Sequence, residues 1–174
     1  MPDRAADLPV ALAEHVASRY FGKYRGIVQS VGSGNELGLI TALVPEVLGS
    51  EATPWAMPAV PFAGAKHGFL ALPEVNDGVW IEFEAGDLTK PIWSGFWWGD
   101  GEIPTPAAEK VRVFATSNGH KLVLDEDNNE IRIEHAGGPS IVLTDSDITL
   151  AVSSKKIVIS SSSVSVNDGA LEVT

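Results

Sequence analysis

The stretch DITLAVSSKKIVISSSSVSV, residues 147–166, alternates apolar and polar side chains with a period of two. That period predicts short β-strands with one apolar face, while serines occupy much of the other face. Each strand therefore presents a single narrow apolar stripe. The stripe is formed by Ile148, Leu150, Val152, Ile157, Ile159, Val164 and Val166.

The same pattern extends on both sides of this stretch. The further apolar pairs are Leu122/Leu124, Ile131/Ile133, Ile141/Leu143 and Leu171/Val173. The turn-forming segments DEDNN (125–129), GGP (137–139) and NDG (167–169) separate the groups. We therefore expect very short strands joined by tight turns over the whole of residues 116–174.

Strands with two inward apolar side chains each cannot build a core from a single chain, and they would leave many unpaired edges. Repeats of this kind become stable when their stripes meet those of other copies. The pattern predicts an intertwined triple-stranded β-helix, and with it a homotrimer. A disordered Ser-rich tail is the alternative, but strict alternation of Val and Ile disfavours it. The residues predicted at the trimer axis are Leu122, Leu124, Ile131, Ile133, Ile141, Leu143, Ile148, Leu150, Ile157, Ile159, Val164 and Val166.

Residues 23–115 have a different texture, which predicts a small barrel. Residues 45–68 hold several prolines and glycines, which indicates a long surface loop. Five strands with such a connection in the middle suit a closed barrel of the OB-fold type, so the fold class is all-β. The predicted strands are YRGIVQSV (24–31), GLITALVPEV (38–47), GVWIEFE (78–84), IWSGFWW (92–98) and VRVFA (111–115).

The N-terminal segment, residues 1–22, predicts a short amphipathic helix. Leu8, Leu12 and Val16 recur at helical spacing, with Asp7 as a cap and Gly22 as a stop. A lone helix ahead of a β domain either packs on that domain or docks on a partner, and the sequence leaves both open.

The aromatic run from Trp93 to Trp98 could stack on bases or sugars, or fill a core. Base stacking needs a basic groove, whereas the neighbours here include Glu82, Glu84 and Asp100. In a regular strand Trp93, Gly95 and Trp97 would share one face. Packing on both faces is the prediction, with sugar binding as the alternative.

Composition excludes several classes of function. The chain of 174 residues carries 23 acidic and 12 basic side chains, a net charge of −11, which disfavours nucleic acid as a partner. It has no cysteine, so disulfides and cysteine nucleophiles are excluded. The first 22 residues lack the features of a secretory signal, so we expect synthesis in the cytoplasm.

The sequence predicts no catalytic, cofactor-binding or metal site, and therefore no enzyme. The four histidines are scattered without ligand spacing. DEDNNE (125–130) lacks the glycine and the distal glutamate of a calcium loop. Glu82 and Glu84 are two apart on a strand, as exposed carboxylates often are, with no sign of a cleft.

The segment PEVNDGVWIEFEAGD (73–87), followed by Pro91 and Gly95, resembles the signature of phage baseplate assembly protein V. The segment 117–143 is similar to the start of the β-helix in the same family, which also resembles the VgrG proteins of type VI secretion. Asn76 stands where the family usually has Gly, and no lysozyme domain is inserted. The barrel signature consists of Gly78, Trp80, Phe83, Gly86, Asp87, Pro91 and Gly95.

This resemblance implies a structural role as the central spike of a contractile injection device, with a membrane-piercing needle. The partners implied are further copies of the chain, a baseplate hub protein and, transiently, a target membrane. Leu171 and Val173 would contact a PAAR-type tip protein, since the chain lacks the His-x-His with which some single-chain spikes hold iron at the tip. The alternative is that the chain end folds over itself as its own point. The implied location is a phage tail baseplate or an extracellular phage-tail-like particle. A glycan-binding, cell-wall-binding or nucleic-acid-binding OB-fold is the alternative.

Overall fold

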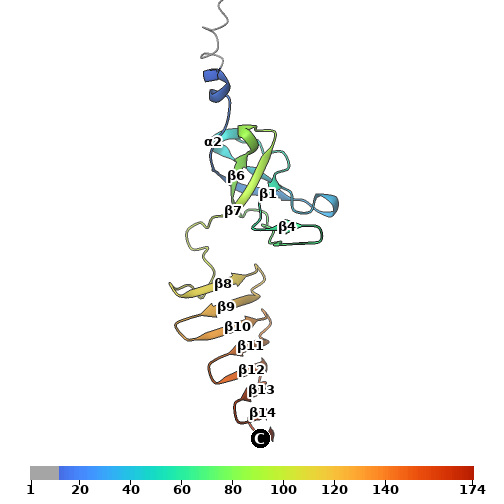
Figure 1. The fold of residues 1–174 in the computed structure, drawn as a ribbon, viewed down its shortest axis with the longest axis vertical. Coiled ribbons are helices and arrows are strands. Elements are labelled where there is room, and N and C mark those ends of the chain that lie inside the picture. Colours follow the sequence, from blue (N-terminus) through green and yellow to red (C-terminus); the bar gives the residue numbers. More distant parts are fainter. Residues whose placement is uncertain (1–11) are drawn as a thin grey trace, which may run out of the picture. The chain divides into compact units, whose positions relative to one another are not determined.

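The computed structural model describes residues 12–174, and the chain divides into two compact units, Met1–Gly101 and Glu102–Thr174 (Figure 1). Each unit is organised around a β-sheet of its own. No helix among the described residues is long and apolar enough to span a membrane.

The first unit contains seven strands, one short α-helix and two 3-10 turns, besides an N-terminal helical segment. These elements are β1 (Tyr24–Val31), η1 (Gly34–Glu36), β2 (Ile40–Leu43), α2 (Pro45–Leu48), β3 (Met57–Pro58), β4 (Ala63–Gly64), β5 (His67–Gly68), β6 (Gly78–Phe83), η2 (Glu84–Gly86) and β7 (Pro91–Phe96), preceded by a helical segment over residues 12–17.

The main sheet of this unit has the strand order β2-β1-β6-β7-β3, and its concave face holds the core. Along β6, Val79, Ile81 and Phe83 are buried while Trp80 and Glu82 are partly exposed, which confirms the alternation expected for GVWIEFE. Burial of such side chains is the main favourable term in folding. The complete core set is Val28, Ile40, Ala42, Val44, Ala56, Val79, Ile81, Phe83 and Trp93.

The segment 52–58 joins the two edges of the curled sheet. It bridges to β2 through the pairs Leu43↔Ala52 and Ile40↔Ala56, and β3 then runs parallel to β7. Thr53 Oγ1 lies in this segment and accepts a hydrogen bond from the backbone N–H of Ala42 at 3.0 Å. The prediction that residues 45–68 form only a surface loop is therefore wrong for this part.

The strand VRVFA was expected to close the barrel, and this prediction is also wrong. The segment forms β8 (Val111–Ala115), which pairs with β9 in the second unit. The fifth strand of the main sheet is β3 instead. Alternation in a five-residue strand indicates which residues share a face, but not which sheet the strand joins.

A β-bulge at Gly95 changes the expected faces of β7. Val79 pairs with Phe96 and Ile81 with Trp93, so two residues of β7 stand opposite Trp80. Gly95 has a φ of +97°, which a residue with a side chain rarely adopts. As a result, Trp93 enters the core while the Trp97 ring covers Gly78 on the other face. The expectation that Trp93 and Trp97 share a face is wrong.

The second unit is a single antiparallel meander of eight strands in sequence order. The expected turns lie between them, with positive φ at Asn129, Gly138 and Asn167. The strands are β8 (Val111–Ala115), β9 (Lys121–Asp125), β10 (Glu130–Glu134), β11 (Ser140–Leu143), β12 (Asp147–Val152), β13 (Lys155–Ser160), β14 (Val164–Val166) and β15 (Leu171–Val173).

The expected N-terminal helix is described only in part. Residues 12–17 are helical and exposed, whereas Asp7, Leu8 and Pro9 lie outside the described residues. Tyr20, after this helical segment, contacts the sheet region: its N–H donates to the Gly86 carbonyl at 3.0 Å, and its ring lies 6.3 Å from that of Phe83. The described turn of helix itself therefore does not pack on the barrel.

Candidate functional site

The strand register of the second unit aligns its apolar side chains in two ladders on one face, which we call the apolar face. Directly opposed residues in an antiparallel pair project to the same side of the sheet. The first ladder contains Phe114, Leu122, Ile133, Ile141, Leu150, Ile157, Val166 and Leu171. The second ladder contains Leu124, Ile131, Leu143, Ile148, Ile159, Val164 and Val173.

All twelve residues expected at a trimer axis therefore lie in these two ladders. Most of the large side chains on this face remain open to solvent in the single chain, with exposed fractions from 37% at Val164 to 61% at Leu171. A groove of about 570 Å³ follows the first ladder along Ile133, Ile141 and Leu150. Contiguous apolar surface on this scale marks an interaction site.

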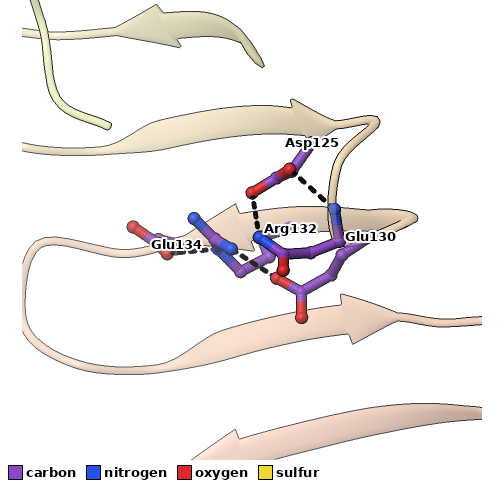
Figure 2. Close-up of polar contacts among 5 residues, drawn as sticks. Asp125, Glu130, Arg132 and Glu134 are labelled. Carbon is purple, nitrogen blue, oxygen red and sulfur yellow. Dashed lines mark hydrogen bonds and ion pairs between the residues drawn. The ribbon is translucent and has the colours of Figure 1, made fainter. Parts of the chain in front are cut away.

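On the opposite face, charged side chains pair with one another within one chain, as Figure 2 shows for Arg132, Glu130 and Glu134. Arg132, largely buried, donates from Nε to Glu134 at 2.9 Å and pairs through Nη1 with Glu130. Hydrogen bonding to Glu130 and Glu134 raises the pKa of Arg132 further above its ordinary value. Val123, directly opposite Arg132 in the register, is fully buried. Only the apolar face therefore lacks a cover.

Asp125 anchors the turn between β9 and β10 on the same face as Arg132 (Figure 2). Its carboxylate accepts the backbone N–H of Asn128 at 3.0 Å and the Asn128 side-chain amide at 2.9 Å. These hydrogen bonds, the side-chain one foremost, hold the pKa of Asp125 below its ordinary value. The acidic segment is thus a structural turn, as the sequence predicts.

Two histidines that are fifteen residues apart in the sequence come together beside the first ladder. The rings of His120 and His135 lie 4.4 Å apart between centroids. Each Nδ1 accepts a backbone N–H, from Ala136 at 3.3 Å and from Gly137 at 3.0 Å. An imidazole that accepts a hydrogen bond at Nδ1 has its N–H at Nε2, which is then a donor and has no lone pair for a metal ion. Sequence spacing alone did not reveal this pair, because it depends on the β9–β10 register.

The barrel-signature residues maintain the shape of the first unit. Phe83 lies in the core, Pro91 begins β7 in a buried position, and Gly95 makes the bulge. Gly78 leaves room for the Trp97 ring, and a Cβ added there would lie 2.7 Å from it.

The turn after β6 uses two further signature residues. Gly86 has a φ of +73° and contacts the chain at Tyr20, which leaves no space for a Cβ. The carboxylate of Asp87 accepts hydrogen bonds from the backbone N–H and the hydroxyl of Thr89 at 3.0 and 2.8 Å. These bonds lower the pKa of Asp87.

The outer face of the main sheet carries Trp80, the remaining signature residue. The Arg25 guanidinium lies 5.8 Å from the Trp80 ring centroid and 5.3 Å from that of Trp97, within cation–π range. Next to them, Glu82 accepts hydrogen bonds from Lys23 at 2.7 Å and from Ser94 at 3.2 Å. The bond to Lys23 lowers the pKa of Glu82, whereas a glycosidase acid needs a raised pKa.

Among residues 12–174, no group of three or more His, Asp or Glu side chains is arranged to hold a metal ion. Leu171 and Val173, expected to contact a tip protein, lie on β15 and are each 61% exposed. The structure thus offers an apolar face and an exposed end strand, while its polar side chains serve turns and strand contacts.

Comparison with known protein families agrees with this arrangement. Residues 24–98 match the type VI secretion system/phage-baseplate injector OB domain. Residues 111–172 match the phage baseplate V C-terminal trimerisation domain. A search of curated proteins found no match. The second match begins at β8, in agreement with the structural assignment of that strand to the second unit.

Proposed function

Since the chain belongs to the phage baseplate V family, a structural and non-enzymatic spike family with a C-terminal trimerisation domain, we propose that it is the membrane-piercing central spike of a contractile injection device. In this proposal it links the baseplate hub to the tip. It is made in the cytoplasm and assembled into a phage baseplate or an extracellular phage-tail-like particle.

The observation that carries the proposal is the pair of apolar ladders. Three copies that turn their ladders toward a common threefold axis would bury two continuous apolar columns each, and burial stabilises by about 25 cal/mol per Å². The polar face, with the Arg132 network, would remain outside and hydrated. The axis would then consist of the predicted residues from Leu122 to Val166.

Such a shaft is suited to a mechanical task. Each strand from β9 to β14 is hydrogen-bonded on both sides within its own chain, so no strand edge would be free along the shaft except at its ends. Force from a contracting sheath would be transmitted through hydrogen-bonded layers and concentrated on a small area of the target membrane.

Light scattering of the full-length protein tests the assembly. The mass expected in native buffer is three times 18.4 kDa. A monomer under these conditions would contradict both the axis assignment and the spike.

The exposure of Leu171 and Val173 on β15 supports a proposed tip partner. Three copies of Leu171 and Val173 around the axis would form a small apolar platform, and such a surface is a liability unless it is covered. We expect a PAAR-type protein of the same source to bind with one cap per three chains. Deletion of residues 171–174 should abolish this binding and leave the trimer intact, and undiminished binding would place the contact elsewhere.

A further inference from the structure

A hairpin on the first unit is exposed to solvent along its whole length. This segment, residues 61–70, which we call the arm, contains β4 and β5, which pair through Ala63↔Gly68 and Gly64↔His67, and the Phe69 N–H donates to the Phe62 carbonyl at 3.0 Å. Every residue of the arm is exposed. Figure 1 draws the hairpin as a separate element beside the curled sheet. An isolated two-stranded hairpin is at best marginally stable in water, so the arm requires an outside contact.

The arm is mostly apolar. Phe62, Phe69 and Leu70 are 58%, 45% and 68% exposed. Lys66, at the turn with a φ of +65°, is the only Lys, Arg, Asp or Glu in this segment. The arm therefore presents two aromatic rings with one cation at its tip.

The chain carries side chains of matching chemistry at the end of β7 and just after it. Phe96 and Trp98 are 44% and 63% exposed, and the exposed Asp100 follows them. In residues 12–174, neither Lys66 nor Asp100 belongs to an ion pair. In the single chain the Phe96 ring lies 5.8 Å from that of Trp93, and much of the Phe96 and Trp98 surface remains open to solvent. We call Phe96, Trp98 and Asp100 the receiving patch.

We propose that the arm of one copy packs on the receiving patch of the next copy, with Lys66 opposite Asp100, so that three such contacts close a ring of OB units. The inference rests on the proposed trimer. The arm and the receiving patch are different surfaces, and a contact between different surfaces forms a ring when its rotation closes.

A second copy of the chain is favoured as the occupant because the trimerisation domain already holds three first units together. Only the nine residues 102–110 separate the first unit from β8, so the effective concentration of one arm for the next patch is high, in the millimolar range of short linkers. Each contact would also place one opposite-charge pair between units of a chain with a net charge of −11.

Cross-linking tests the contact directly, because the protein has no cysteine of its own. The variant Lys66→Cys/Asp100→Cys should, after mild oxidation, form covalent dimers and trimers on a non-reducing gel. The control Lys66→Cys/Gln29→Cys, in which Gln29 is an exposed residue of β1, should remain monomeric on the same gel. A trimer in solution that yields only an internal disulfide, or none, would refute the contact. A monomeric chain in solution would refute the proposed function as well.

Trypsin provides a second test, since Lys66 is the single Lys or Arg between Arg25 and Lys90. The wild-type trimer should resist cleavage after Lys66. Phe62→Ser/Phe69→Ser should retain the trimer mass, through the C-terminal domain, and be cleaved at least about tenfold faster, because proteolysis follows the population of the open arm. Equally rapid cleavage of both trimers would show that the arm is free.

Discussion

The two units use the same alternation of apolar and polar side chains, but they cover the resulting apolar face in different ways. In the first unit the sheet curls, the segment 52–58 joins its edges, and Ile40, Val79 and Ile81 become fully buried. In the second unit the strands form an open meander. Most of the large apolar side chains in its two ladders are 37–61% exposed in the single chain. The difference shows that a buried face is encoded locally, whereas the element that covers it can come from the same chain or from another.

The largest effect should come from a charge on the ladders. Ile157→Asp would place three carboxylates together in an apolar layer, where an unpaired buried charge costs several kcal/mol per ion. We expect this variant, and Ile148→Asp equally, to lose the trimer, with light scattering showing a monomer. The first unit should remain folded, because its core lies within one chain.

Neighbouring positions provide the control for this prediction. Val158 lies between Ile157 and Ile159 in β13 and pairs with Thr149 and Ser165 on the other face. Val158→Asp and the exposed Ser161→Asp should keep the trimer, with at most a moderate fall in the thermal midpoint. Dissociation by Val158→Asp but not by Ile157→Asp would mean that the two faces are assigned the wrong way round.

A core truncation in the first unit should have the opposite pattern. Ile81→Ala removes a fully buried side chain that contacts Gly26 across the sheet, and such substitutions cost about 2–5 kcal/mol. The first unit should unfold at lower denaturant concentration while the trimer mass stays unchanged. All five tryptophans lie between Trp55 and Trp98, so tryptophan fluorescence reports on this unit alone.

The exposed Gln29→Ala on β1 is the matched control, and it should leave the fluorescence transition where it is. Far-UV circular dichroism would follow the backbone of both units in the same samples. Loss of the trimer in Ile81→Ala would contradict the independence of the two cores.

Both apolar faces could be predicted from the sequence, because each depends only on the period of two. The pairs from Leu122/Leu124 to Leu171/Val173 lie on one side of the second sheet, and Val79, Ile81 and Phe83 lie on one side of β6. The turns at 125–129 and 167–169 could also be predicted from the sequence, since Asn, Asp and Gly tolerate positive φ.

The features that the sequence did not reveal are set by pairing between distant segments. The place of β8 depends on its partner β9, and the fifth strand β3 is only two residues long and so has no detectable alternation. The bulge at Gly95 shifts the register by one residue and moves Trp97 to the other face. The His120–His135 pair likewise exists only through the strand register.

The smallest of the predicted effects concerns the face of the second unit that is complete within one chain. The Asp125 carboxylate accepts two hydrogen bonds from Asn128, and these lower its pKa from the ordinary value of 3.8. A lowered pKa means that the ionised form stabilises the fold, and this contribution is present above pH 3.8 and lost as the pH falls through the lower folded-state value. Asp125→Asn should therefore lower the thermal midpoint at neutral pH.

The pH dependence separates this contribution from a general weakening of the turn. The difference in thermal midpoint between wild type and Asp125→Asn, measured by circular dichroism, should be constant from pH 7 to about pH 5 and shrink below about pH 4. Asp127→Asn in the same turn removes an exposed carboxylate paired with Lys110 at 3.5 Å and should differ little from wild type. Because the Asp125 contacts lie within one chain, the trimer mass should stay unchanged throughout. A difference that persisted unaltered below pH 3 would show that the charge of Asp125 plays no part, and that the turn depends on its shape alone.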